Sequence, residues 1–327
     1  MPKRLVLVVA ALLHWSALGC QRPAPRLVVV TVEVATLPHF SLVHVAQAKG
    51  YFQSEGLAVT LRTHQFGQAA LTAMLAGDAD LATCAETPVV FAELRGVRLS
   101  VLASIARATR TSAVIARRER GINGPADLAQ RTIGVTFGTS GAFFLDTLLL
   151  QNGVDRRDVH LVDLKPEAMA DALARGEVDA VATWNPTAAA LRGRFGEKVA
   201  AFYAEELFSD NGLVVSRRGF AQQRPEAASR FLRALLRAEG LFRAAPEEAR
   251  RTASSVLVGE PASLDTMLRL FDFRVRLDQG LLVLMEEESD WARRSGQAPG
   301  SATPDLRATV ESAPLLAVKP DAVGFLK

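Results

Sequence analysis

The chain has 327 residues, 49% hydrophobic and 22% charged, which is typical of globular proteins and long enough for two separate cores. Its formal charge is +3, but two of the 38 basic residues, Lys3 and Arg4, lie in what we interpret as a removable leader; without them 36 basic residues stand against 35 acidic ones. No lysine- or arginine-rich tract is interleaved with aromatic residues, so the pattern of a protein that follows a phosphate backbone is missing, and we expect no nucleic-acid partner.

The N-terminus has the pattern of an export signal. Lys3 and Arg4 form its positive end, and the apolar run 5–13 is too short to span a bilayer comfortably. The letters SALGC that follow resemble a bacterial lipoprotein signal, in which Cys20 would become the lipid-bearing first residue of the mature chain.

We therefore predict a signal peptide at 1–19 and a tether at 20–26, with the protein anchored to a membrane by lipid on the periplasmic or extracellular side. Plain secretion as a soluble periplasmic protein and an uncleaved anchor are the alternatives. If Cys20 carries lipid, no intramolecular disulfide can form, because Cys84 is the only other cysteine.

From residue 27 onward, expected strands alternate with expected helices, which indicates parallel sheets with crossover helices. The first series is a strand at 27–34, a helix at 41–55, a strand at 57–61, a short helix at 71–75 and strands at 80–84 and 99–105. The second series is strands at 112–116 and 132–137, a helix at 140–150, a strand at 159–164, a helix at 166–175, and strands at 179–184 and 212–216. Helices then follow at 225–244, 246–257, 262–271 and 281–294. The pattern predicts two α/β lobes followed by a helical C-terminal region.

One unit occurs twice: GDADLATCAETP at 77–88 and GEVDAVATWNP at 176–186. In each copy a helix stops at glycine, an acidic turn leads into a buried strand, and the next helix begins near a proline. We expect Thr87 and Asn185 to cap those helices, with Pro88 and Pro186 in the first helical position. Because ligands of open α/β sheets collect at the carboxyl ends of strands, the loops after the two strands are expected to face a ligand from different lobes.

Five stretches resemble the solute-binding components of ABC importers, in the branch that takes nitrate, sulfonates and taurine and includes binders of thiamine-pyrimidine precursors. They are LPHFSLVHVAQAKGYFQSEGL (37–57), AGDADLA (76–82), PADLAQRTIGV (125–135), GTSGAFFLDTLL (138–149) and ARGEVDAVATWNP (174–186). The resemblance covers about residues 27–300.

The resemblance implies the type II periplasmic-binding fold, in which two α/β lobes joined by a two-strand hinge close around a ligand. It places lobe one at 27–110 plus 211–327 and lobe two at 111–210, with the connecting strands crossing near 109–112 and 209–212. It also implies a monomer without enzymatic activity or cofactor, which hands its solute to a permease and that permease's ATPase.

The residues GTSG at 138–141 follow a strand and open a helix, so backbone N–H groups, the hydroxyls of Thr139 and Ser140 and the helix dipole make a corner suited to an anion. We therefore expect Thr139, Ser140 and Gly141 in the site; the alternative is that Ser140 only caps the helix. Ala142 stands where a nucleophile elbow needs glycine, and no Gly-Lys-Ser/Thr of a P-loop follows.

Further candidates lie at the ends of other strands. Trp184 is expected to stack on the ligand or to be a packed structural indole, and Asn185 to be a cap that also touches the ligand. Glu86 and Asp210 are expected to hold an ammonium or ring N–H opposite the anion corner; a solvated helix start and a turn residue are the alternatives. The remaining candidates for ligand contact are His39, Phe40, Gln65, Thr83 and Thr87.

A metal site is not expected, because the spacing of His39, His64 and Glu86 fits no compact ligand motif. Cys84 is expected to be a small buried strand residue and the acidic run 286–288 a solvated helix face.

The sequence thus predicts an extracytoplasmic binding protein for a small oxyanion-type or amino-bearing solute of the sulfonate, taurine or nitrate class. A binder of a thiamine-pyrimidine precursor, an enzyme on the same fold and a sensory module are the alternatives.

Overall fold

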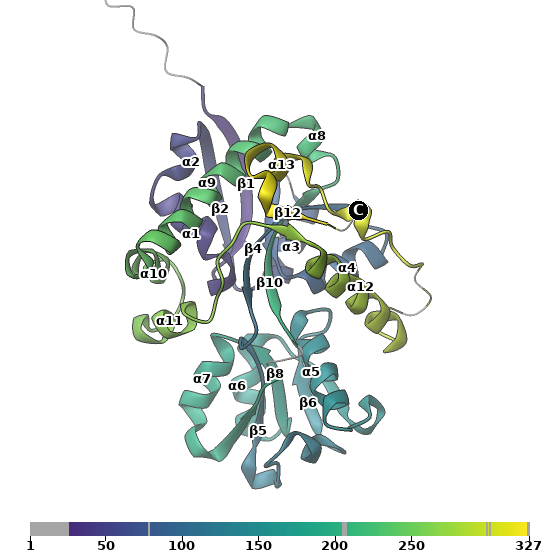
Figure 1. Ribbon diagram of the computed structural model, residues 1–327. Coiled ribbons are helices and arrows are strands. Elements are labelled where there is room, and N and C mark those ends of the chain that lie inside the picture. The colour runs from purple at the N-terminus through teal and green to yellow at the C-terminus, as the bar shows by residue number, and fades with distance from the viewer. Residues whose placement is uncertain (1–25, 78, 205–207, 299, 301, 326–327) are drawn as a thin grey trace, which may run out of the picture.

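The computed structural model describes residues 26–77, 79–204, 208–298, 300 and 302–325. Within these residues the chain forms two five-stranded sheets, one above the other in Figure 1, each with helices on both sides. The upper sheet and its helices are named lobe 1 here, and the lower ones lobe 2. The two expected α/β units are therefore present as separate layered bodies.

Lobe 1 has the strand order β2-β1-β3-β10-β4, in which β1 runs parallel to β2 and β3 while β10 runs antiparallel to β3 and β4. The elements of its first part are β1 (Val28–Ala35), η1 (Pro38–Phe40), α1 (Ser41–Ala48), α2 (Tyr51–Ser54), β2 (Leu57–His64), α3 (Gly67–Ala76), β3 (Leu81–Cys84), α4 (Glu86–Leu94) and β4 (Leu99–Ala108).

Lobe 2 repeats this plan with the order β7-β6-β8-β5-β9, in which β6 runs parallel to β7 and β8 while β5 runs antiparallel to β8 and β9. Its elements are β5 (Ser112–Arg117), η2 (Arg118–Arg120), η3 (Pro125–Leu128), β6 (Thr132–Val135), α5 (Ser140–Gln151), η4 (Arg156–Asp158), β7 (His160–Asp163), α6 (Pro166–Arg175), β8 (Ala180–Trp184), α7 (Thr187–Phe195), η5 (Gly196–Lys198) and β9 (Val199–Phe202). The repeated unit of the sequence accordingly supplies β3 and β8, which hold equivalent central positions in the two sheets.

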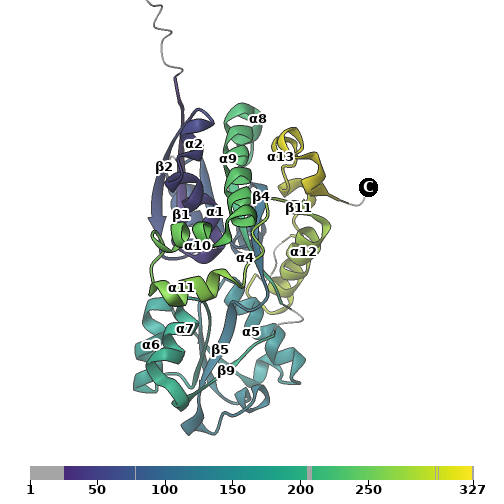
Figure 2. The ribbon, with the colours of Figure 1, turned by 60° about the vertical axis from the view of Figure 1, so that its left-hand side comes forward.

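The chain passes from lobe 1 to lobe 2 at 109–111, between β4 and β5, and is again part of lobe 1 at β10 (Asp210–Arg217), which pairs with β4. The remaining elements complete lobe 1 and are α8 (Phe220–Gln223), α9 (Pro225–Ala244), α10 (Pro246–Ser254), α11 (Pro261–Leu268), β11 (Leu277–Asp278), α12 (Gln279–Arg294), η6 (Arg307–Thr309), α13 (Ala313–Val318), η7 (Pro320–Ala322) and β12 (Val323–Gly324). Helices α1, α2 and α9 lie on one side of the upper sheet and α3, α4 and α12 on the other, as the two ribbon views show (Figures 1 and 2).

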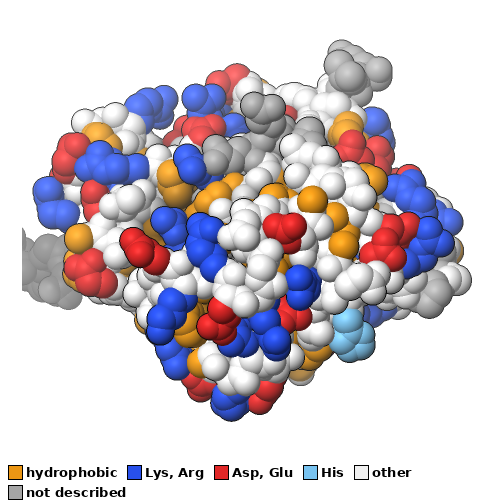
Figure 3. Space-filling model, turned by 90° about the horizontal axis from the view of Figure 1, so that it is seen from below, with side chains coloured by type: hydrophobic (Ala, Val, Ile, Leu, Met, Phe, Trp, Pro, Cys, Tyr) orange, Lys and Arg blue, Asp and Glu red, His pale blue; other side chains and the backbone are white. Residues whose placement is uncertain are grey.

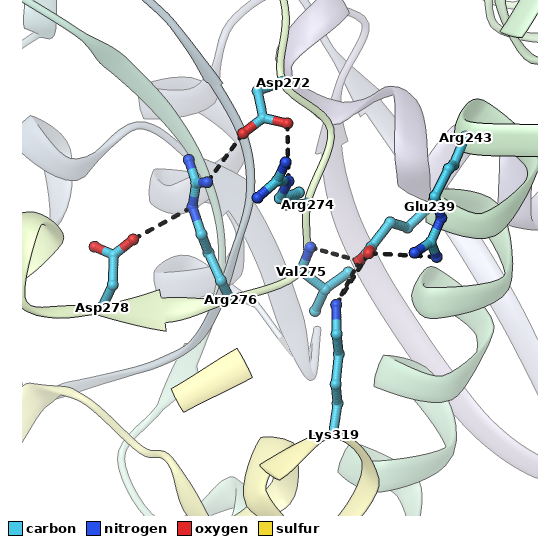
Figure 4. A network of polar contacts seen from close by, with 8 residues as sticks. All are labelled: Glu239, Arg243, Asp272, Arg274, Val275, Arg276, Asp278 and Lys319. Carbon is cyan, nitrogen blue, oxygen red and sulfur yellow. Dashed lines mark hydrogen bonds and ion pairs between the residues drawn. The ribbon is translucent and has the colours of Figure 1, made fainter. Parts of the chain in front are cut away.

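A segment without regular structure covers the free edge of β4. Backbone hydrogen bonds join Arg107 to Asp272 and Ser104 to Arg276, so the edge is not left open for pairing with another chain. A polar network holds the segment in place (Figure 4). The buried carboxylate of Glu239 accepts the N–H of Val275 at 2.9 Å and the ammonium of Lys319 at 3.0 Å, which ties α9 to the segment and to the C-terminal region.

Several expected elements match closely, and the helix at 166–175 and the long helix at 225–244 have the expected bounds. Both begin at a proline, and the first ends before Gly176, whose φ of 74° is a left-handed conformation that glycine adopts without strain. The single helix expected at 41–55 is wrong, because Gly50, with φ of 69°, separates α1 from α2. Strands β9, β11 and β12 were not expected.

The expected caps are also wrong. Helix α4 begins at Glu86 after Ala85, so Thr87 and Pro88 lie inside its first turn. Helix α7 begins at Thr187, after a cis peptide bond between Asn185 and Pro186.

The face of lobe 2 turned away from lobe 1 has basic and acidic side chains intermixed, without an extended patch of one sign (Figure 3). This view agrees with the near balance of charge in the sequence. None of the helices in the described ranges is both long and apolar enough to cross a membrane.

Candidate functional site

A small cavity of about 30 Å³ lies between the two lobes, at the carboxyl ends of strands from both sheets. Residues of both lobes line it, and side chains of the two lobes are in contact across it. The lining residues are Leu37, His39, Phe40, Phe66, Gly67, Gln68, Ala85, Pro88, Thr139, Ser140 and Trp184.

Three helices begin at this cavity: α3 and α4 from lobe 1 and α5 from lobe 2. Their N-cap residues are Phe66, Ala85 and Thr139, and in none of the three does the side chain of the N-cap residue bond to the N–H groups of the first turn. The hydroxyl of Thr139 instead donates to the carbonyl oxygen of Thr136 at 2.6 Å. Uncapped first turns leave N–H donors and the positive ends of three helix dipoles at one place, which suits an anion.

Glycines allow these helices to approach so closely. A Cβ on Gly67, the first residue of α3, would lie 2.7 Å from the Cα of Cys84, so only glycine fits against the end of β3. A Cβ on Gly141, the second residue of α5, would lie 3.3 Å from the ring of Trp184. The start of α3 therefore lies against the end of β3, and the start of α5 lies against the indole wall of the cavity.

Aromatic and amide side chains join the lobes across the cavity. The indole of Trp184 in lobe 2 lies 6.4 Å, between ring centres, from the ring of Phe66 in lobe 1. The amide nitrogen of Gln68 donates to the carbonyl oxygens of Phe137 and Gly138, both at 3.3 Å. These contacts close the cavity toward a wider opening of about 610 Å³, which residues of both lobes line.

Behind the cavity lies a buried cluster of three carboxylates: Glu86, Asp210 and Glu288, all at most 1% exposed. Asp210 accepts hydrogen bonds from the hydroxyls of Thr111 and Ser112, where the chain crosses into lobe 2. No ion pair with lysine or arginine neutralises the three carboxylates within the described residues.

Glu86 and Glu288 belong to α4 and α12. One Glu86 oxygen accepts the backbone N–H of Asn211 at 3.1 Å, and one Glu288 oxygen accepts the hydroxyl of Thr87 at 2.5 Å. The second oxygen of each carboxylate has no hydrogen-bond partner among the described residues, and neither has Nδ1 of His39.

Burial decides the protonation of this cluster. Loss of solvation raises the pKa of Glu86 to about 8, and the charge of Asp210 acts in the same direction. Loss of solvation also raises the pKa of Glu288, with a further contribution from the charge of Glu86. Burial lowers the pKa of His39, although the charge of Asp210 opposes it. These shifts favour the protonated forms of Glu86 and Glu288 at neutral pH.

The family model for NMT1/THI5-like proteins matches residues 37–249 of the chain, about two thirds of its length. The chain belongs to the NMT1/THI5-like family. The matched part includes both crossings between the lobes and all the residues that line the cavity.

Two of the similar proteins are named for the sulfonates that they bind. The taurine-binding periplasmic protein of Escherichia coli is 26% identical over 247 residues, which cover 74% of this chain and 73% of that protein. The alkanesulfonate-binding protein SsuA of Xanthomonas axonopodis pv. citri, solved with bound MOPS, is 20% identical with a TM-score of 0.75, covering 87% of this chain and 98% of that one. The desulfurization enzyme DSZB shares the fold at 18% identity and a TM-score of 0.68, covering 90% and 99%. The expected fold class and the resemblance to solute-binding proteins are thus confirmed.

Of the twelve side chains expected at the site, five line the cavity: His39, Phe40, Thr139, Ser140 and Trp184. Gly141 touches the indole of Trp184 from behind. Glu86, Thr87 and Asp210 belong to the buried polar cluster rather than to the cavity wall.

The other three lie apart from the cavity wall. Gln65 is exposed, and the backbone N–H of half-buried Asn185 donates to Thr111. The hydroxyl oxygen of Thr83, inside β3, accepts the N–H of Ala35 at 3.1 Å. Cys20 lies outside the described residues.

The expected site omitted Gly67, Gln68 and Leu37, and it placed the contact after β2 at Gln65 rather than at Phe66. The rule that pointed to the loops after β3 and β8 also applies to β2, whose following helix begins at Gly67. The solvated face expected at 286–288 is wrong for Glu288, which is buried, whereas Glu286 and Glu287 are exposed. Within the described ranges, no group of three or more His, Cys, Asp or Glu side chains is placed to hold a metal ion.

Proposed function

We propose that this chain is the extracytoplasmic solute-binding component of an ABC importer and that it captures a small sulfonate, preferably one that also carries an ammonium group. The observation that carries the proposal is the convergence of three uncapped helix starts, from both lobes, on one cavity walled by Trp184 and Phe66. A sulfonate offers three oxygens to such donors and one charge to three helix dipoles.

The buried carboxylates next to the cavity supply the second half of the proposal. A ligand ammonium reaching Glu86 and Asp210 would balance charge that no arginine or lysine balances within the described residues. Taurine, named in one relative, has both groups on a two-carbon chain. Bare nitrate offers no cation, and an aminopyrimidine offers ring N–H groups without the oxyanion.

Closure of the lobes is the proposed mechanism of capture. Ligand contacts come from α3 and α4 in lobe 1 and from α5 in lobe 2, so binding favours the closed arrangement over an open one. A permease with its ATPase would then receive the solute from a monomeric binding protein held at the membrane by lipid on Cys20.

Binding rather than catalysis is favoured by the state of Cys84. It is the one cysteine in the described residues, its side chain is buried, and burial raises the pKa of its thiol, so it offers no thiolate nucleophile to the cavity.

A thermal-shift and calorimetric screen tests the proposal. Taurine should raise the melting temperature more than ethanesulfonate, which has the same length without the amine, and both should exceed nitrate and an aminopyrimidine. Ser140→Ala and Trp184→Ala should each weaken taurine binding about tenfold or more, whereas Ser255→Ala, at an exposed serine after α10, should not. Unchanged affinity in both site variants would show that the ligand lies elsewhere. A preference for the aminopyrimidine would point to the precursor-binding branch of the family.

A further inference from the structure

Trp291 joins the lobes at a place outside the ligand cavity. It lies on α12 of lobe 1, and its indole Nε1 donates to Oδ2 of Asp146, on α5 of lobe 2, at 2.7 Å. The ring also meets Phe91 of lobe 1, with centres 6.0 Å apart at 78°, and Phe143 of lobe 2, with centres 5.2 Å apart at 63°. One largely buried side chain, 9% exposed, therefore makes polar and aromatic contact with the opposite lobe.

The hydrogen bond matters to Asp146 because its carboxylate has no comparable donor within lobe 2. Arg156 Nε lies 3.2 Å from Oδ1 but is not directed at it as a hydrogen bond, and neither atom has a hydrogen-bond partner among the described residues. Burial raises the pKa of Asp146, while the indole N–H and the charge of Arg156 oppose that rise. Parting the lobes would remove the one directed donor and leave the carboxylate to be hydrated.

The same helix also reaches the ligand site. Glu288 precedes Trp291 by three residues, so the two share one face of α12, and Glu288 accepts the hydroxyl of Thr87 beside Glu86. On the other side of the contact, Phe143 meets Phe208, which lies in the segment that returns from lobe 2 to lobe 1. The residues around Trp291 are thus linked on one side to Thr87 of α4 and on the other to Phe208, two residues before β10.

We propose that Trp291 and Asp146 form a closure latch, a pair of positioning residues that set ligand affinity without touching the ligand. The proposal rests on the proposed function in one respect, namely that ligand affinity depends on the closed state. The latch exists only when the lobes are together. Its hydrogen bond and ring contacts therefore lower the free energy of the closed state and increase the fraction of molecules that can hold a ligand.

Two measurements test the latch: the radius of gyration from small-angle X-ray scattering of the full chain without ligand, and the dissociation rate of taurine. Trp291→Phe keeps an aromatic ring but lacks the N–H, and Asp146→Leu removes the acceptor. Each should increase the radius of gyration and weaken taurine binding about tenfold, mainly through faster dissociation. Asp146→Asn retains an oxygen that accepts the indole N–H and should remain within about threefold of the parent protein.

The controls separate a latch from a structural effect. Asp290→Asn changes a carboxylate on the same helix whose ion pairs, among the described residues, are with Arg293 and Arg294 of that helix, and it should leave both measurements unchanged. The double variant Trp291→Phe/Asp146→Leu should weaken binding no more than either single change, since both remove one interaction. Circular dichroism confirms that each variant is folded.

The latch is overturned if folded Trp291→Phe and Asp146→Leu proteins keep the parent radius of gyration and dissociation rate. If no sulfonate binds the parent protein, the proposed function fails, but the ligand-free scattering still decides the latch.

Discussion

Gly141 packs closely against the indole of Trp184: a Cβ at this position would lie 3.3 Å from both Cε3 and Cζ3 of the ring. Glycine therefore lets the first turn of α5 and the wall of the cavity occupy adjacent space. The same residue would ordinarily be a poor choice near the start of a helix, because alanine favours helix by about 1 kcal/mol. The packing of Trp184, rather than helix propensity, therefore explains why residue 141 is glycine.

We expect Gly141→Ala to separate stability from binding. The added methyl pushes the Trp184 ring by a few tenths of an ångström toward the cavity, so taurine affinity should fall about three- to tenfold. The free energy of unfolding should stay within about 1 kcal/mol of the parent value, because better helix propensity offsets the tighter packing. Calorimetry and urea denaturation measure the two quantities.

Gly193→Ala is the matched control, since this glycine is also helical and a Cβ added to it would meet nothing within 4 Å. It should leave affinity unchanged. Equal affinity of Gly141→Ala and the parent protein would show that Trp184 does not wall the ligand.

The Cys84 thiol should be unreactive in the folded protein. Its side chain is fully buried in β3 and burial raises its pKa, so almost no thiolate exists at pH 8. In a Cys20→Ser variant, which removes the other cysteine, a thiol reagent such as DTNB should react only after urea unfolds the chain. Rapid reaction of Cys84 with DTNB in the folded protein would show an accessible thiolate and would favour the alternative of an enzyme.

Lipid on Cys20 can be tested in cells. If the export signal is that of a lipoprotein, the parent protein should fractionate with membranes and Cys20→Ser should release it or leave it unprocessed. Metabolic labelling with an alkyne fatty acid gives an independent reading. A soluble parent protein without label would favour plain secretion.

The parts of the fold that follow from local signals were predictable. Helices α6 and α9 begin at Pro166 and Pro225, and these prolines alone place the starts correctly. The strands β3 and β8 and the loops after them follow from a repeated pattern, which is why Trp184 was found. Such features depend on neighbours in the sequence.

The remainder depends on residues far apart in the chain. The sequence pattern predicts that Glu288 belongs to an exposed acidic run. In the fold, however, its carboxylate is buried and accepts a hydrogen bond from Thr87, 201 residues away. Thr87 is predicted to cap a helix, but its hydroxyl instead donates a hydrogen bond to the carboxylate of Glu288. No local pattern contains either fact.

Glu86 predicts an unusual pH dependence of stability. Its pKa in the folded protein is raised to about 8 from an ordinary value of 4.5, so between these pH values the folded state holds a proton that the unfolded state has lost. The contribution of Glu86 to the free energy of unfolding is therefore greatest below pH 4.5 and is lost as pH rises toward 8, by up to about 1.4 kcal/mol per pH unit. Glu288 acts in the same direction.

Glu86→Gln should remove this loss, because the amide is neutral at every pH and its oxygen can still accept the N–H of Asn211. The difference in unfolding free energy between variant and parent should be small at pH 4 and should reach about 2–5 kcal/mol in favour of the variant at pH 8. Ligand binding should change in the opposite direction: taurine should bind more weakly to the variant, while ethanesulfonate, which brings no ammonium, should bind equally to both proteins. Glu286→Gln, at an exposed position of α12, should change neither the stability profile nor binding. A flat difference curve for Glu86→Gln would mean that the Glu86 carboxylate is ionised in the folded protein at neutral pH. An equal loss of affinity for taurine and for ethanesulfonate would mean that Glu86 maintains the shape of the site but does not bind the ammonium group.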